Sequence, residues 1–140
     1  MDKILLVDDQ PGIRQVLSDD LGAEGYVVRT AGCANEVSGC LRGFRADLVL
    51  LDLFLDGPQG WDVLQEIKQG HPDLPVVIFT AYDSYAEDPK LSLADGYVVK
   101  SSDLTELKTT ILRVLENRNM EPSWPAGTPA LRSSLSKFTK

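Results

Sequence analysis

Five short apolar runs alternate with segments of helical periodicity, and this alternation restricts the fold more than any other feature. The runs are KILLV (3–7), YVVRT (26–30), DLVLL (47–51), PVVIF (75–79) and GYVVK (96–100). The third and fourth are almost entirely apolar, which is typical of strands covered on both faces. Between and after them, helices are predicted over Pro11–Glu24, Ala34–Arg42, Gln59–Gln69 and Asp103–Asn117. This order predicts an α/β fold with a doubly wound parallel sheet and right-handed crossovers.

The fourth crossover, residues 82–95, departs from the pattern. Pro89 lies where a helix should run, and a proline inside a helix costs about 3 kcal/mol. We therefore expect a short or broken helix that begins at Pro89 itself.

The periodic pattern ends near residue 118, which divides the chain into two parts. Residues 1–118 are long enough for one domain, and their βα units account for all of the predicted core. Residues 119–140 contain three prolines, show little periodicity and carry a net charge of +2. This composition predicts a proline-rich linker or a poorly ordered tail.

The charge balance of the predicted domain excludes some partners and favours others. Residues 1–118 carry 11 basic and 20 acidic side chains, a net charge of −9. Such a surface argues against direct binding to nucleic acid and suits cations and basic partner surfaces.

The chain has no run of 18 apolar residues, so we expect no membrane span. Cys33 and Cys40 lie seven residues apart in a predicted helix, roughly 10 Å along its axis, too far for a disulfide. Free thiols favour a cytoplasmic location.

Polar residues follow four of the predicted strands at the point where each strand ends. They are Asp8, Asp9, Asp52, Thr80 and Lys100. The carboxyl ends of parallel strands meet at one edge of the sheet, and ligands bind there in such folds. The sequence therefore predicts three carboxylates, one hydroxyl and one ammonium at a single edge. Adjacent aspartates repel each other when they lose water, so a positive charge is expected between them.

These residues stand in the motifs LLVDDQ, LVLLDLFL with Gly60 following, VVIFTA, and GYVVK. Together they resemble the receiver domain of bacterial two-component response regulators over about residues 2–118. The resemblance implies a flavodoxin-like (βα)5 fold with strand order 2-1-3-4-5. It also implies a phosphoryl-accepting switch rather than a turnover enzyme, with a sensor histidine kinase as the partner that supplies the phosphoryl group.

The resemblance assigns a role to each polar residue at the edge. Asp52 would be the phosphoacceptor, since carboxylates serve as covalent phosphoryl acceptors. Asp9, Asp52 and the backbone carbonyl of Phe54 would bind Mg²⁺, with Mn²⁺ as an alternative ion, and Asp8 would act through water. Lys100 and Thr80 would contact the phosphoryl oxygens and stabilise their charge.

The resemblance further implies a conformational switch. Thr80 would move toward the phosphoryl group, and Tyr97 would rotate inward to fill the space that Thr80 leaves. The fourth crossover, the strand at 96–100 and the helix at 103–117 would form the output surface. This surface is the expected face of a homodimer, or the contact with an output domain.

Two features depart from the family pattern, and two further positions flank the site. Ser101 follows Lys100 where the family usually has a proline joined by a cis bond; a cis bond before serine costs about 3 kcal/mol, so we expect a trans bond. The interval from Thr80 to Tyr97 is about two residues shorter than in the family, which shortens part of the output surface. Phe54 and Tyr82 are bulky aromatics that flank the site, and we expect them to hinder water and slow hydrolysis of the phosphoryl group.

Three alternatives are open at this point. A degenerate receiver would act as a binding module without phosphorylation. A phosphatase or phosphotransferase that uses Asp52 would want a second acid two residues later, where this chain has Phe54. A flavin-binding protein would need a phosphate-cradling loop after the first strand, where Asp8 and Asp9 would repel phosphate.

Overall fold

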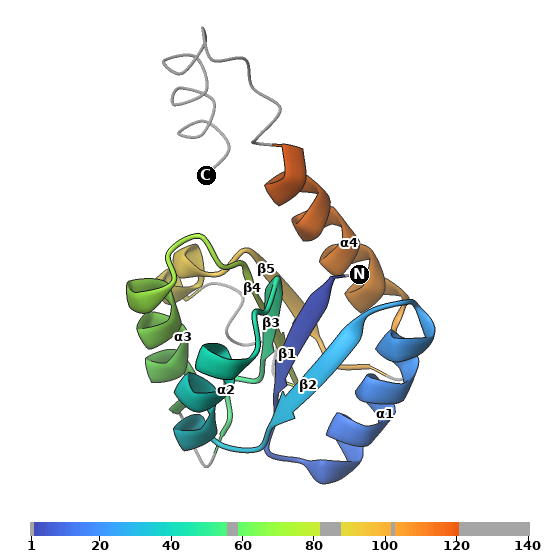
Figure 1. The fold of residues 1–140 in the computed structure, drawn as a ribbon, viewed down its shortest axis with the longest axis horizontal. Coiled ribbons are helices and arrows are strands. Elements are labelled where there is room, and N and C mark those ends of the chain that lie inside the picture. The colour runs from blue at the N-terminus through green and yellow to red at the C-terminus, as the bar shows by residue number, and fades with distance from the viewer. Residues whose placement is uncertain (1, 56–58, 82–87, 102, 121–140) are drawn as a thin grey trace, which may run out of the picture.

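A five-stranded parallel sheet runs through the middle of the molecule (Figure 1). The structure is a computed structural model that describes residues 2–55, 59–81, 88–101 and 103–120. Its strands are β1 (Lys3–Val7), β2 (Val27–Ala31), β3 (Leu48–Leu51), β4 (Val76–Thr80) and β5 (Gly96–Val99). Their spatial order is β2-β1-β3-β4-β5, with every neighbouring pair parallel. The predicted fold class and strand order are confirmed.

Helices cover both faces of the sheet. One face carries α1 (Pro11–Ala23) and α4 (Thr105–Met120), and the opposite face carries α2 (Val37–Gly43) and α3 (Gln59–Gly70). Two short 3-10 helices, η1 (Ala34–Glu36) and η3 (Pro89–Leu93), pack on the same side as α2 and α3. The chain therefore forms three layers, as the doubly wound pattern requires.

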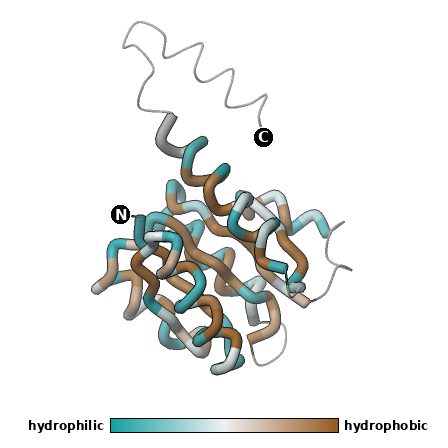
Figure 2. Tube along the Cα trace, turned by 90° about the vertical axis from the view of Figure 1, so that its right-hand side faces the viewer, coloured by the Kyte–Doolittle hydropathy of each residue, from teal (hydrophilic) through white to brown (hydrophobic). Residues whose placement is uncertain are grey.

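The two cores follow directly from the alternation of side chains along a strand. In β1, Leu5 and Val7 face the helices α2 and α3, whereas Ile4 and Leu6 face α1 and α4. All residues of β3 and β4 are buried, which confirms that their apolar runs are covered on both faces. Figure 2 shows the same arrangement, with hydrophobic residues along the central strands and hydrophilic residues around them.

Several element boundaries differ from the predictions by one to three residues. β4 begins at Val76 rather than Pro75, because proline has no N–H to give to the ladder. The predicted helix 34–42 is a 3-10 turn followed by the seven-residue α2. The last helix begins at Thr105 rather than Asp103, whose carboxylate Oδ1 accepts a hydrogen bond from the Thr105 N–H at 2.9 Å. The predicted linker from 119 to 140 lies almost wholly outside the described residues, so that division stays a prediction.

Two glycines are required by the local geometry. Gly25 ends the first βα unit with φ of 101°, a conformation that glycine adopts without steric cost. Gly60 opens α3 directly against the segment that follows β3, and its N–H donates to the Leu53 carbonyl at 3.0 Å. A Cβ atom on Gly60 would collide with the backbone of Leu53. Close approach of these two segments thus depends on glycine.

The described part of the fourth crossover contains the five-residue η3, which begins at Pro89 as predicted and is capped by the Asp88 carboxylate on the Lys90 N–H. Residues 82–87 of this crossover lie outside the described residues. The described residues contain no cis peptide bond, so the Lys100–Ser101 bond is trans, as expected.

Other expectations concern the thiols and the membrane. Cys33 and Cys40 are free and half-buried, which confirms the absence of a disulfide between them. Among the described residues, none of the helices has the length and apolar character needed to cross a bilayer.

Candidate functional site

Strand pairing brings the acids of two different strands together. Val7 and Leu51 are partners in the β1–β3 ladder, so Asp8 and Asp52 leave the sheet side by side. The Asp52 N–H donates to the Val7 carbonyl at 2.9 Å, which extends the ladder by one step. Both carboxylates are buried, with Asp8 1% and Asp52 6% exposed.

Lys100 arrives at the same place from the far edge of the sheet. Thr80 and Val99 are partners in the β4–β5 ladder, and the Lys100 N–H donates to the Thr80 carbonyl at 2.7 Å. The Lys100 Nζ atom then lies 2.6 Å from Asp8 Oδ2 and 3.1 Å from Asp52 Oδ2. A single ammonium therefore bridges two buried carboxylates.

Backbone donors hold the remaining oxygens of these two acids. Asp8 Oδ1 accepts from the Gln10 N–H at 2.9 Å, and Asp52 Oδ1 accepts from the Phe54 N–H at 3.1 Å. These bonds set the direction of both carboxylates before any ligand arrives. The side chains are thus preorganised by the turns that follow β1 and β3.

Asp9 completes an acidic group that could hold a metal ion. One oxygen each from Asp8, Asp9 and Asp52 lie within 4.8 Å of one another. Asp9 is more open to solvent than the other two, and it makes no hydrogen bond or ion pair to the part of the chain that the structure describes. Lys100 offsets only one of the three negative charges. A hard divalent cation with a preference for oxygen ligands, such as Mg²⁺, fits this donor set.

The buried environment shifts the proton affinities of the paired groups. Burial raises the pKa of the Asp52 carboxyl, and the Phe54 N–H and Lys100 offset this only in part. Burial alone would lower the pKa of Lys100, but the hydrogen bond to Asp8 and the charges of Asp52 and Asp8 outweigh it and leave that pKa raised. Lys100 is therefore charged at neutral pH, whereas ionised Asp52 carries an electrostatic cost that added positive charge would relieve.

The other predicted site residues have different surroundings. Thr80 is fully buried at the end of β4, on the strand between Asp52 and Lys100. Tyr97 is half-buried in β5 and packs against the core under α3 and η3. Phe54 is partly buried, and only its N–H is shown to contact Asp52. Tyr82 lies outside the described residues. The roles assigned to these four residues stay predictions.

Arg14 was not among the predicted site residues, although its side chain contacts the backbone of Asp8. Its Nη1 atom donates to the backbone carbonyl of Asp8 at 2.7 Å from the first turns of α1. A signal was present, because a cation near a helix N-terminus opposes the helix dipole and calls for an explanation. It was missed because Arg14 follows no strand and makes its contact through the backbone.

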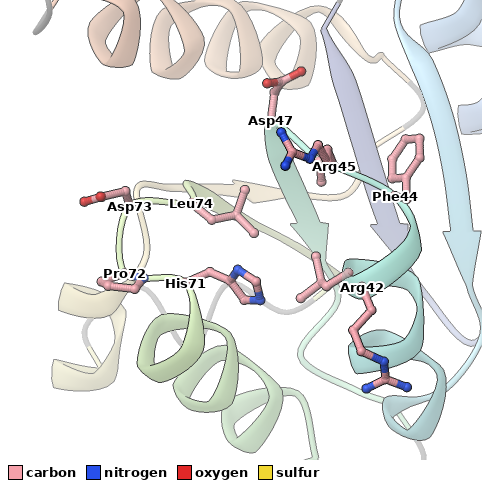
Figure 3. A pocket seen from close by; sticks show the side chains of 10 residues that line it. Arg42, Phe44, Arg45, Asp47, His71, Pro72, Asp73 and Leu74 are labelled. Atoms are coloured by element: carbon pink, nitrogen blue, oxygen red, sulfur yellow. The ribbon is translucent and has the colours of Figure 1, made fainter.

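A hollow of about 780 Å³ opens near the other end of the sheet, away from the acids (Figure 3). It is lined by Leu41, Arg42, Phe44, Arg45, Ala46, Asp47, His71, Pro72, Asp73 and Leu74. The helices α2 and α3 both end there, and helix C-termini carry partial negative charge. Together with Asp47 and Asp73 they balance the two arginines, so the hollow has no clear preference for a charged ligand. It contains none of the predicted site residues.

The comparison with protein families gives one clear match. A family model described as the response regulator receiver domain matches residues 4–112. Among curated proteins, the probable transcriptional regulatory protein TcrX of Mycobacterium tuberculosis is 36% identical over 107 residues, which are 74% of this chain and 45% of TcrX. The DNA-binding transcriptional regulator NtrC of Rhizobium meliloti is 35% identical over 122 residues, which are 86% of this chain and 25% of NtrC. The chain thus spans half or less of the length of these relatives.

Solved structures give the same result at the level of the whole fold. The response regulator protein TrrA of Thermotoga maritima, in complex with Mg²⁺-BeF, is 38% identical with a TM-score of 0.77. The match covers 81% of this chain and 99% of TrrA. A second structure holds TrrA in complex with the histidine kinase ThkA, again with 38% identity and a TM-score of 0.77, and covers 82% of this chain and 99% of that chain.

Removal of the Lys100 ammonium should strongly destabilise the metal-free protein. In Lys100→Met, Asp8 and Asp52 stay buried without their common cation, and loss of one partner of a buried pair costs about 3 kcal/mol or more. Urea denaturation in EDTA measures this loss in the free energy of unfolding. The double variant Lys100→Met/Asp52→Asn should recover part of it.

Lys90→Met is the matched control, because Lys90 is largely exposed and its ion pair with Asp88 is long at 3.9 Å. It should cost less than about 1 kcal/mol. Equal losses for the Lys100 and Lys90 variants would show that the bridging ion pair does not stabilise the site.

Proposed function

Because this chain belongs to the response regulator receiver domain family, we propose that it accepts a phosphoryl group on Asp52 from a sensor histidine kinase in the cytoplasm. The phosphorylated domain is a signalling switch rather than a turnover enzyme. The observation that carries this proposal is the position of the Asp52 carboxylate at the carboxyl end of the sheet, where it is buried, lies 3.1 Å from the Lys100 Nζ atom and has an oxygen within 4.8 Å of one from Asp9. The kinase as donor is supported by the similar protein TrrA, whose structure was solved in complex with the histidine kinase ThkA.

In the proposed reaction, an Asp52 carboxylate oxygen attacks the phosphorus atom of a phosphohistidine. A new oxygen–phosphorus bond forms and the nitrogen–phosphorus bond breaks, with its electron pair going to the histidine nitrogen. The product is an acyl phosphate on Asp52. The Phe54 N–H keeps one Asp52 oxygen fixed at 3.1 Å, so the other is the candidate nucleophile.

That second oxygen, Oδ2, now binds Lys100. During transfer, the Lys100 ammonium is proposed to exchange its hydrogen bonds to the carboxylates for one to a phosphoryl oxygen bound at the same site. The Thr80 hydroxyl, at the end of the intervening strand, is proposed to bind another phosphoryl oxygen. Both groups then stabilise negative charge where it develops.

We further propose Mg²⁺ as the cofactor. Asp9, Asp52 and the backbone carbonyl of Phe54 would hold it, with Asp8 acting through water. When bound, it would offset the charge of the acids and of the incoming phosphoryl group. The three converging carboxylates support this, and so does the Mg²⁺-BeF complex of the similar TrrA.

The switch is proposed to pass from Thr80 to Tyr97. Thr80 is fully buried, and Tyr97 packs against the same core cluster as Leu91 and Ala94 of the η3 region. A shift of Thr80 toward the phosphoryl group would allow Tyr97 to move inward and would alter the contacts of η3. The output surface would then be η3, β5 and α4, read by a second copy of the chain or by an output domain. The regulators TcrX and NtrC make a transcriptional output the natural proposal.

Phosphorylation should be specific to Asp52. With acetyl phosphate and Mg²⁺, intact-protein mass spectrometry should show a gain of one phosphate for the wild type and none for Asp52→Ala. Asp62→Ala removes an exposed acid from the first turn of α3 and should label like the wild type. An equal gain in Asp52→Ala would contradict the assignment. A wild type that gains no phosphate would favour the degenerate receiver.

Hydrolysis of the phosphoryl group should depend on Phe54. We propose that this aromatic side chain, and Tyr82 in the same way, hinder the water that attacks the phosphorus atom. After removal of the donor, Phe54→Asn should lose its phosphate severalfold faster than the wild type in a mass-spectrometric time course. Equal or slower loss in the variant would contradict the proposal.

A further inference from the structure

We propose that Arg14 is a positioning residue that raises the affinity of the acidic site for a divalent cation. It does so by holding the backbone between Asp8 and Asp9, without touching the cation. The inference rests on the cation site of the proposed function, but it concerns a residue to which neither the sequence motifs nor that proposal assigned a role.

The contact itself is short and well defined. Arg14 Nη1 donates to the Asp8 carbonyl oxygen at 2.7 Å, and the Arg14 side chain is half-buried. This carbonyl belongs to the planar peptide unit whose nitrogen is that of Asp9. A bond that fixes the carbonyl therefore also orients the N–Cα bond of Asp9 and restricts the directions in which its side chain can leave the backbone.

The guanidinium is held from a second side. It lies against Gly32 in the turn after β2, where an added Cβ atom would come within 2.9 Å of Arg14 Nη1. Arg14 thus ties the turn after β1 to the turn after β2. The Asp8 carboxylate is fixed separately by the Gln10 N–H and Lys100. Asp9 has no such contact with the part of the chain that the structure describes, so its placement depends on the backbone on either side of it, which Arg14 helps to hold.

Arg14 leaves the acidic oxygens available for a ligand. Within the described residues it makes no ion pair with any carboxylate, although three acids lie nearby. An arginine that only neutralised the cluster would be expected to bind a carboxylate oxygen, often in bidentate fashion. Its bond to a carbonyl instead is what a positioning role requires.

An electrostatic role and a positioning role of Arg14 predict opposite effects on metal binding. A nearby positive charge repels a divalent cation, so removal of a merely electrostatic Arg14 should tighten binding. Removal of a positioning Arg14 should weaken it, because outer contacts that orient metal ligands typically contribute about tenfold or more in affinity.

The test is isothermal titration of the full chain with MgCl₂. Arg14→Gln removes the charge and the long donor, and Arg14→Lys keeps the charge but loses the planar fork. Both should raise the dissociation constant about tenfold. Gly32→Ala leaves every charge in place and displaces only the flexible end of Arg14, so it should weaken binding in the same direction but less. Arg42→Gln, an exposed arginine on α2, is the charge-matched control and should bind like the wild type.

Unfolding by urea in EDTA shows whether each variant is folded. If Arg14→Gln does not fold, the Mg²⁺ affinity of Gly32→Ala still tests the positioning role. Mg²⁺ binding by Arg14→Gln that equals or exceeds that of the wild type would overturn the positioning role while leaving the proposed function intact. A wild type that binds no Mg²⁺ would overturn both.

Discussion

The bridge from Lys100 to Asp8 and Asp52 is the interaction on which the carboxyl end of this sheet depends. It joins the ends of β1, β3 and β5 through side chains, across β4, whose Phe79 ring centre lies 5.8 Å from the Lys100 Nζ atom. Two carboxylates could not be buried this close together without it, because each would lose hydration and repel the other. Lys100 offsets one of the three negative charges, and the charge that is left favours a cation in the proposed site. Structural stability and the proposed chemistry therefore share the same charges.

Because neighbouring parallel strands are in register, residues that must lie together at the edge of the sheet occupy equivalent positions after each strand in the sequence. Because β1 and β3 are in register up to Val7 and Leu51, the acids that follow them must emerge together. The same argument places Lys100 beside Thr80 at the end of β5. This is why the fold class and the gathering of these residues could be predicted from apolar runs and the residues that end them, whereas the strand order was implied by the resemblance to the receiver family. The start of η3 at Pro89 could likewise be predicted, since the effect of a proline on a helix is local.

Features that depend on tertiary contacts could not be predicted from the sequence pattern. Nothing in the periodicity of residues 34–42 indicated that the segment begins as a 3-10 turn before α2. Arg14 acts through a backbone carbonyl, and no pattern of side chains marks such a contact. The close approach of Gly60 to Leu53 became clear only once α3 was placed against the end of β3. The roles proposed for Thr80 and Tyr97 require motion, and the residues that end a strand carry no signal for motion.

We propose that Asp9 and Asp52 hold a divalent cation while Lys100 exchanges its carboxylate partners for a phosphoryl group. This can be checked in a crystal structure of the chain with Mg²⁺ and beryllofluoride, a phosphoryl mimic. We expect the mimic on Asp52, the ion bound by Asp9 and Asp52, and Lys100 Nζ hydrogen-bonded to a fluorine rather than to both acids. An ion bound elsewhere, or Lys100 still bridging Asp8 and Asp52 beside a bound mimic, would contradict it.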